Sequence, residues 1–253
     1  MCRKGWHVVT SLVVPSIVAL ALMGLVWPAH AQNRAPLPPV EDMVAQFSSV
    51  AFGHEHGISR DIIQKWTAPP SIAYFIRPQF DVEPHVRRIR GLLEEIYSLT
   101  GMAPPPADAG TSVTLRFGFY PRSDFRKLPL SERSEETRRF FSQSACIAVA
   151  VNNPNRPGDI TTGAIVVGTD ISERLRRHCI AEELVQVLGL PNDACLYRPS
   201  LFCEQDVVDH MTPADRILLA TLYDERIAVG MTRVDAMPVV RQVISELYAD
   251  SEG

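Results

Sequence analysis

Several features common in enzymes and membrane proteins are missing from this sequence of 253 residues. No apolar run after residue 27 is long enough to cross a bilayer, so no later membrane span is predicted. A Gly-x-Ser-x-Gly motif and a phosphate-binding glycine loop are both absent, which argues against an α/β-type serine hydrolase and a P-loop protein. The chain has no internal repeat and no excess of positive charge, its net charge being −4. These absences argue against repeat proteins and nucleic-acid-binding proteins.

The N-terminus carries the signals of an exported protein. Two basic residues precede an apolar stretch at 8–27, and Ala29 and Ala31 have the spacing that signal peptidase recognises. This pattern predicts a signal peptide over residues 1–31, and therefore a periplasmic or secreted protein without a stable membrane span. A retained membrane anchor is the alternative, but the apolar stretch is short and breaks at Pro28.

Cleavage after residue 31 would leave 222 of the 253 residues, enough for one large domain. We expect a flexible, proline-rich lead-in over 32–42 and a single domain over 43–253. Loss of the two basic residues moves the net charge from −4 to −6, so we expect an acidic protein with no nucleic-acid partner. Arginine clusters at 87–90, 138–139 and 174–177 lie among acids on predicted helices and are typical of solvated helix faces.

Four cysteines remain after Cys2 leaves with the signal peptide. In an oxidising compartment an even set predicts two disulfides, for which three connectivities exist. We favour Cys195–Cys203, which closes a short loop, and Cys146–Cys179, which joins a strand to the start of a helix. The alternative is that Cys179 is a free thiol or a metal ligand.

Hydrophobic periodicity predicts strands and helices that alternate along the chain. Strands are expected at 71–76, 112–120, 146–151 and 163–167. Helices are expected at 59–66, 82–99, 131–143 and 170–188, from the N-cap Thr212 onward, and at 235–248. This order predicts an α+β or α/β single domain in which a mixed sheet is packed by helices, with further helices at the C-terminal end.

The helix predicted at 170–188 is apolar over most of its circumference, which indicates that it is buried. Its one polar stripe consists of Cys179, Glu182, Glu183 and Gln186. Buried carboxylates must be paired, protonated or coordinated, so the stripe is a candidate site. The alternative is an ordinary polar stripe that meets solvent or satisfies the backbone of a loop.

The stretch 182–193 resembles the metzincin branch of the zinc peptidases, whose frame is His-Glu-x-x-His-x-x-Gly-x-x-His, often followed by Asp. In that frame Glu183 matches the general base, Gly189 matches the glycine that turns the chain toward the third metal ligand, and Asp193 follows that ligand. The resemblance extends over about residues 72–223. It implies a zincin-like fold with Glu183 as the candidate catalytic residue.

The three metal positions of that frame hold Glu182, Gln186 and Asn192 in place of histidines. Amide oxygens bind zinc poorly, and one carboxylate does not replace three imidazoles, so the substitutions argue against a zinc-activated water. A calcium ion, which prefers oxygen ligands, could use these three residues together with Glu183. Other candidate ligands are His178 paired with Glu182 one helical turn away, and the histidines outside this helix, His54, His56 and His210.

A wider pattern adds Cys179, the Glu-Glu-Leu-x-Gln core and the segment Leu222-Tyr223-Asp224. This pattern resembles an exported bacterial family named domain of unknown function 2927. The resemblance implies the fold and the export route, and it implies no particular activity.

Three hypotheses for the stripe follow. The first is a non-catalytic or strongly divergent peptidase-like protein that binds a peptide or a cell-envelope partner through Glu182, Gln186, Asn192 and Asp193. The alternative is an active hydrolase in which Glu183 is the general base, with a non-zinc metal or with none. A purely structural hypothesis makes Glu183 and Gln186 partners of the backbone around Asn192 and Asp193.

Overall fold

The structure is a computed structural model that describes residues 36–53, 61–105, 113–128, 135–203 and 205–252. The predicted signal peptide and the His54-Glu55-His56 triplet lie outside these ranges. The helices and strands are α1 (Val40–Phe52), β1 (Lys65–Trp66), β2 (Ile72–Ile76), α2 (Glu83–Thr100), β3 (Leu115–Tyr120), the 3-10 helix η1 (Arg122–Lys127), α3 (Glu135–Gln143), β4 (Cys146–Asn152), β5 (Asp159–Gly168), α4 (Glu173–Val187), α5 (Pro213–Tyr223) and α6 (Arg233–Glu252). This order confirms the predicted fold class, a mixed sheet packed by helices with helices at the C-terminal end.

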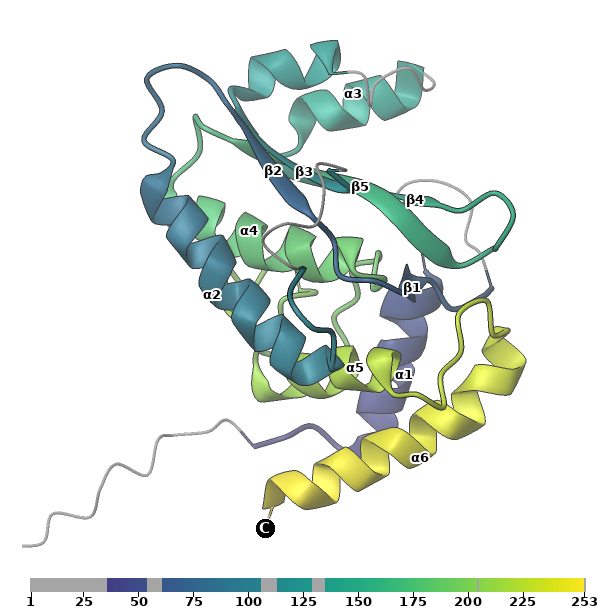
Figure 1. Ribbon diagram of the computed structural model, residues 1–253. Coiled ribbons are helices and arrows are strands. Elements are labelled where there is room, and N and C mark those ends of the chain that lie inside the picture. Colours follow the sequence, from purple (N-terminus) through teal and green to yellow (C-terminus); the bar gives the residue numbers. More distant parts are fainter. Residues whose placement is uncertain (1–35, 54–60, 106–112, 129–134, 204, 253) are drawn as a thin grey trace, which may run out of the picture. The chain divides into compact units, whose positions relative to one another are not determined.

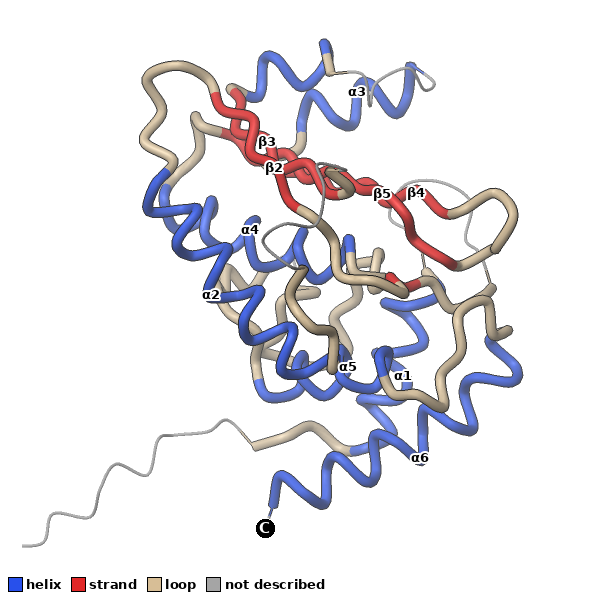
Figure 2. The backbone as a smooth tube through the Cα atoms, viewed as in Figure 1, coloured by secondary structure: helices blue, strands red, loops and turns tan. Residues whose placement is uncertain are grey.

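The strands form one mixed sheet (Figure 2). β3 lies between β2 and β5 and is parallel to both, with Leu115 opposite Gly163 of β5. β1 adds a short parallel pair to β5. β4 runs antiparallel to β5, with Cys146 opposite Val167, and β5 is its only partner among the described strands. β4 is therefore an edge strand of the described sheet.

Helices cover both faces of this sheet (Figure 1). α2 and α4 lie on one face, where α4 packs against β4 and β5. η1 and α3 lie on the other face, over a small apolar cluster of Phe125, Phe141, Ile147 and Val166. The larger core lies on the α4 side and continues into α1, α5 and α6. α4 therefore has a layer on each side, which explains why its sequence is apolar around most of its circumference.

Helix α1 covers a stretch for which the sequence pattern predicted no element. It begins at Val40, inside the segment expected to be a lead-in, and buries Met43, Phe47 and Val50 completely. The helix packs against α6, far away in sequence. Neither α1 nor any other helix in the described part of the chain is long and apolar enough to cross a membrane.

The prediction of a short helix at 59–66 is wrong for residues 61–66, which are the ones that the structure describes. Lys65 and Trp66 form strand β1 instead. The Trp66 indole Nε1 also donates a 2.9 Å hydrogen bond to the Val187 carbonyl at the end of α4. Long-range partners supply the hydrogen bonds that a helix would supply locally, and such partners leave no local signal in the sequence.

One member of the arginine cluster at 174–177 is not on a solvated face. Arg176 is 8% exposed. Its guanidinium donates hydrogen bonds to the carbonyls of Gly168, Thr169 and Ile171. It thereby fastens the first turn of α4 to the end of β5. The expectation failed here because a run of charges does not reveal which side chain turns inward.

A capping box begins α5 and confirms the predicted N-cap. The Thr212 hydroxyl accepts a hydrogen bond from the Asp215 backbone N–H at 3.2 Å, and the Asp215 carboxylate accepts one from the Thr212 N–H at 2.9 Å. Asp215 also accepts from Ser200 and from the Leu201 N–H, so this buried carboxylate ties the preceding loop to the helix. Its burial raises the pKa of Asp215, and these hydrogen bonds oppose that shift.

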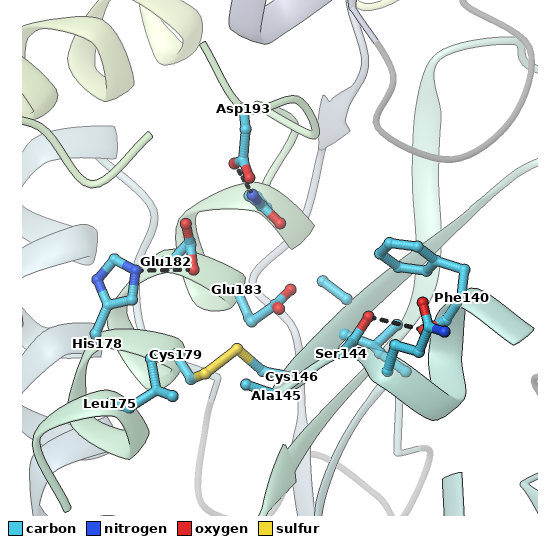
Figure 3. A pocket seen from close by; sticks show the side chains of 14 residues that line it. Phe140, Ser144, Ala145, Cys146, Leu175, His178, Cys179, Glu182, Glu183 and Asp193 are labelled. Atoms are coloured by element: carbon cyan, nitrogen blue, oxygen red, sulfur yellow. Dashed lines mark hydrogen bonds and ion pairs between the residues drawn. A yellow bond between two sulfur atoms is a disulfide. The ribbon is translucent and has the colours of Figure 1, made fainter. Parts of the chain in front are cut away.

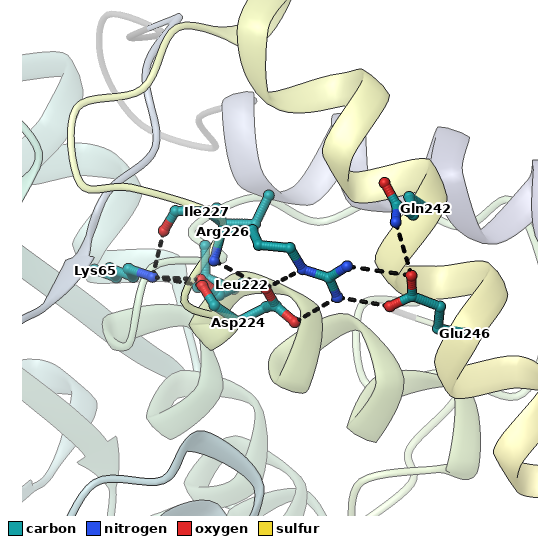
Figure 4. Close-up of polar contacts among 7 residues, drawn as sticks. All are labelled: Lys65, Leu222, Asp224, Arg226, Ile227, Gln242 and Glu246. Atoms are coloured by element: carbon teal, nitrogen blue, oxygen red, sulfur yellow. Dashed lines mark hydrogen bonds and ion pairs between the residues drawn. The ribbon is translucent and has the colours of Figure 1, made fainter.

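A half-buried lysine joins β1 to the end of α5 and the chain that follows it (Figure 4). The Lys65 Nζ donates at 2.9, 3.5 and 2.6 Å to three carbonyl oxygens, those of Leu222, Asp224 and Ile227. Burial lowers the pKa of Lys65 to about 8, and the Asp224 carboxylate opposes the shift. Arg226 then connects Asp224 to Glu246 of α6. The C-terminal helices are thus linked to the sheet by polar contacts as well as by the core.

Candidate functional site

Local sequence signals set both ends of α4. The Ser172 side chain accepts a hydrogen bond from the Leu175 N–H, so Ser172 is the N-cap. After the helix, Gly189 has a φ of +122°, and a Cβ at this position would collide with the Gln64 carbonyl oxygen. The predicted end of the helix before Gly189 is therefore confirmed, and the turn there needs glycine.

The predicted polar stripe lies on a side of α4 that is largely out of water. The exposed fractions of Cys179, Glu182, Glu183 and Gln186 are 0, 8, 6 and 6%. Two carboxylates and an amide are therefore held where charge and hydrogen-bonding groups need compensation. Side chains compensate two of these groups, since His178 lies beside Glu182 and Asp193 accepts a hydrogen bond from Gln186.

A pocket of about 300 Å³ opens beside this stripe (Figure 3). Residues of the stripe form one wall, and the end of α3 and the first half of β4 form the other. Figure 3 shows the Glu183 carboxylate directed toward the side of the pocket that holds Ser144 and Phe140. A concave site of this size with a few converging polar groups has the character of a small ligand-binding site.

The Glu182 carboxylate is directed toward His178 (Figure 3). The Nε2 of His178 lies 3.2 Å from the Glu182 carboxylate, and its Nδ1 lies 2.6 Å from the Val208 carbonyl oxygen. Both neighbours accept hydrogen bonds, so the geometry favours a doubly protonated ring. Burial lowers the pKa of His178 and Glu182 raises it, with a net shift upward. The predicted meeting of His178 and Glu182 is therefore present.

The residues at the end of α4 face two different ways. Gln186 donates from Nε2 to the Asp193 carboxylate at 2.7 Å, and both side chains line the pocket. Asn192 turns instead toward α1, where its Nδ2 donates to the Ser49 carbonyl at 3.1 Å. Asn192 also donates to the Asp193 carbonyl at 2.9 Å and does not line the pocket. The four-oxygen calcium set is therefore not assembled, because Asn192 lies apart from its other members.

Both favoured disulfides are formed. Cys146–Cys179 joins β4 to α4 and lies in the wall of the pocket. Cys195–Cys203 closes the short loop after α4. Cys179 is therefore neither a free thiol nor a metal ligand in this structure. Two disulfides, and no membrane-spanning helix in the described residues, are compatible with a protein outside the cytoplasm.

One group in the described part of the chain has the composition of a metal site. The Cys146 Sγ and carboxylate oxygens of Glu182 and Glu183 lie within 4.8 Å of one another. Of the separate histidine candidates, His210 is exposed and contacts its neighbour Asp209. His54 and His56 lie outside the described residues.

Sequence reasoning missed the wall of the pocket opposite α4. It contains Phe140, Gln143, Ser144 and Ala148. A partial signal was available, because a disulfide from Cys179 to β4 must bring β4 beside a stripe that includes Cys179. The end of α3 offered no such signal, since its residues have no chemical mark that distinguishes them from an ordinary helix end.

Comparisons with known proteins agree with the family resemblance in the sequence and do not support the resemblance to the zinc peptidases. The search of curated proteins gave no match, and the search of solved structures gave none either. The family model described as "Protein of unknown function (DUF2927)" matches residues 40–242, from the start of α1 into α6. Because this match covers most of the sequence, the chain belongs to that family.

Proposed function

We propose that this protein binds an extended peptide segment, either a free peptide or part of a cell-envelope protein, in the pocket between α4 and β4. The observation that carries the proposal is that a buried carboxylate, Glu183, and the outer edge of β4 meet in one pocket. The two disulfides support a periplasmic or secreted setting. The absence of histidine from the three metal positions of the metzincin frame supports binding and not catalysis by histidine-bound zinc.

The hydrogen-bond pattern identifies the backbone groups that β4 leaves at its outer edge. The Gly168 N–H of β5 donates to the Ala145 carbonyl. In an antiparallel pair the backbone groups point alternately toward and away from the partner, so Ile147 also bonds to β5. Cys146 and Ala148 then direct their N–H and C=O groups to the outer edge. These two residues also line the pocket.

An extended segment added to this edge would gain backbone hydrogen bonds, as in other complexes formed by strand addition. Its side chains would alternate between the two faces of the sheet, and those on the α4 face would enter the pocket. Glu183 and Asp193 there favour a segment that carries a basic group. Backbone pairing would provide affinity, and the pocket would provide selectivity.

The zincin-like resemblance and the hydrolase alternative rest on the same carboxylate. What supports the alternative is that Glu183 lines an open pocket, where a general base must be to meet a substrate. Cleavage of a protein substrate is therefore measured together with binding.

Binding is tested with a library of fluorescein-labelled hexapeptides, using fluorescence polarisation. Glu183→Gln and Ala148→Pro should each weaken binding of the selected peptides by about tenfold or more, the second because proline has no N–H at the outer edge. Glu94→Gln on the exposed face of α2 is the matched control and should bind normally. Binding that survives both pocket variants, in proteins with unchanged circular dichroism, would contradict the proposal. Casein cleavage that Glu183→Ala abolishes would establish the hydrolase alternative instead.

A further inference from the structure

The Cys146–Cys179 disulfide lies directly beside two acidic side chains of α4. The Cys146 Sγ and oxygens of Glu182 and Glu183 lie within 4.8 Å of one another, and the Cys179 Sγ is bonded to the Cys146 Sγ. Three potential ligand atoms, one sulfur and two carboxylate oxygens, therefore lie close together in the pocket wall, and a second sulfur is bonded to the first. We propose that Cys146, Cys179, Glu182 and Glu183 bind a zinc ion when this disulfide is reduced.

The ligand types and their spacing suit zinc. Thiolates and carboxylates are both regular zinc ligands, and four of them complete the tetrahedral shell that zinc prefers. Zinc bonds of about 2.0–2.3 Å place tetrahedral ligand atoms about 3.3–3.8 Å apart. The ligand atoms of Cys146, Glu182 and Glu183 are at most about one ångström farther apart than that, and the two sulfurs become free to separate once their bond is reduced.

The disulfide decides whether the site exists. In the oxidised protein each sulfur is held in the S–S bond and offers no thiolate. A dithiol reductant changes this: it transfers two electrons and two protons, its own sulfurs form a disulfide, and the Cys146–Cys179 bond is replaced by two thiols. Zinc then binds the two sulfurs and releases the two thiol protons to solvent. Both cysteines line the pocket, which gives a small reductant a route to the bond.

Neighbouring contacts hold one of the acidic ligands, Glu182, in place. His178 lies 3.2 Å from one carboxylate oxygen of Glu182 and leaves the other oxygen for a metal. The histidine is itself fixed by its 2.6 Å contact with the Val208 carbonyl. Outer contacts of this kind orient metal ligands and commonly change affinity by about 10–100-fold when removed. The site differs from the metzincin frame, because Gln186 and Asn192 take no part in it.

Zinc titration of the purified protein, against a chromophoric competitor, tests the proposal. After reduction with tris(2-carboxyethyl)phosphine the protein should bind one equivalent of zinc, about 100-fold more tightly than the oxidised protein does. The Cys195→Ser/Cys203→Ser variant should keep this behaviour. The matched Cys146→Ser/Cys179→Ser variant should lose it. Equal zinc affinity for the oxidised and reduced forms, or equal affinity for the two double variants, would overturn the proposal.

A second variant answers the question without a reductant, even if the reduced protein unfolds. Cys179→Ser leaves Cys146 as a free thiol beside Glu182 and Glu183 while Cys195–Cys203 stays intact. Cobalt ion added to this variant should give thiolate-to-metal absorption in the near ultraviolet, and Glu182→Gln should weaken its binding by about tenfold. The absence of that absorption from folded Cys179→Ser protein would also overturn the proposal. No peptide is present, so the result does not depend on the proposed function.

Discussion

Gln186 and Asp193 form a 2.7 Å hydrogen bond that links the polar side of α4 to the loop after it. The bond crosses the turn at Gly189 and lies at the end of the pocket. In the metzincin frame Gln186 stands at the second metal position, and Asp193 follows the third. The interaction therefore gives Gln186 a structural role that needs no metal.

Gln186→Leu tests this role. Leucine keeps the volume but removes the buried amide that donates to the half-buried Asp193 carboxylate, so the free energy of unfolding should fall by about 1–3 kcal/mol. Urea denaturation followed by circular dichroism measures the change. Gln143→Leu, an exposed position on the opposite wall of the pocket, is the matched control and should change stability little. An unaltered midpoint for Gln186→Leu would show that the bond does not stabilise the fold.

Gly189→Ala should be strongly destabilising. The φ of +122° is unfavourable for alanine, and the added Cβ would collide with the Gln64 backbone. Together these effects should lower the free energy of unfolding by about 2–4 kcal/mol. Gly91→Ala in α2 is the control, because a Cβ there meets open space and alanine should stabilise the helix by about 0.5–1 kcal/mol. Equal effects of the two substitutions would contradict this account of the turn.

Lys65→Met should loosen the attachment of the C-terminal helices. The substitution keeps an unbranched side chain but leaves the carbonyls of Leu222, Asp224 and Ile227 without the ammonium donor. We expect a loss of about 1–3 kcal/mol in the free energy of unfolding at pH 7, measured by urea denaturation. Lys127→Met, at a side chain that is mostly exposed, is the matched control and should have little effect. Similar losses in both variants would argue against a specific role for Lys65.

Burial of Lys65 also predicts a pH dependence. Its pKa falls from 10.5 to about 8 in the folded protein, so between these values the unfolded state binds more protons than the folded state. The contribution of Lys65 to the free energy of unfolding must then rise with pH across this window, and is smallest below pH 8. Carbon-13 NMR of lysine side chains can measure the folded pKa, because the chain has only Lys4, Lys65 and Lys127. The signal that Lys65→Arg removes should titrate near pH 8, and a midpoint above 10 would contradict the prediction.

Much of the candidate site was predictable from the sequence, because its signals are local. Helical spacing alone places Cys179, Glu182, Glu183 and Gln186 on one polar stripe. A cap at Asp170 or Ser172 and a helix end before Gly189 depend on neighbouring backbone groups, and the structure has the cap at Ser172 and the turn at Gly189. The favoured Cys146–Cys179 pair also placed β4 beside the stripe, although the shape of the pocket could not be deduced from it.

The sequence by itself therefore determined the order of the longer strands and helices from β2 to α6, the end of α4 before Gly189 and the chemical character of the polar side of α4. Tertiary structure alone decided that Lys65 enters a strand, that Arg176 turns inward and that Asn192 faces α1. It also decided that Cys146 and Ala148 present their backbone at the edge beside Glu183. The physical reason is the range of the interactions: periodicity and capping act within a few residues, whereas these outcomes depend on partners that only the folded chain brings together.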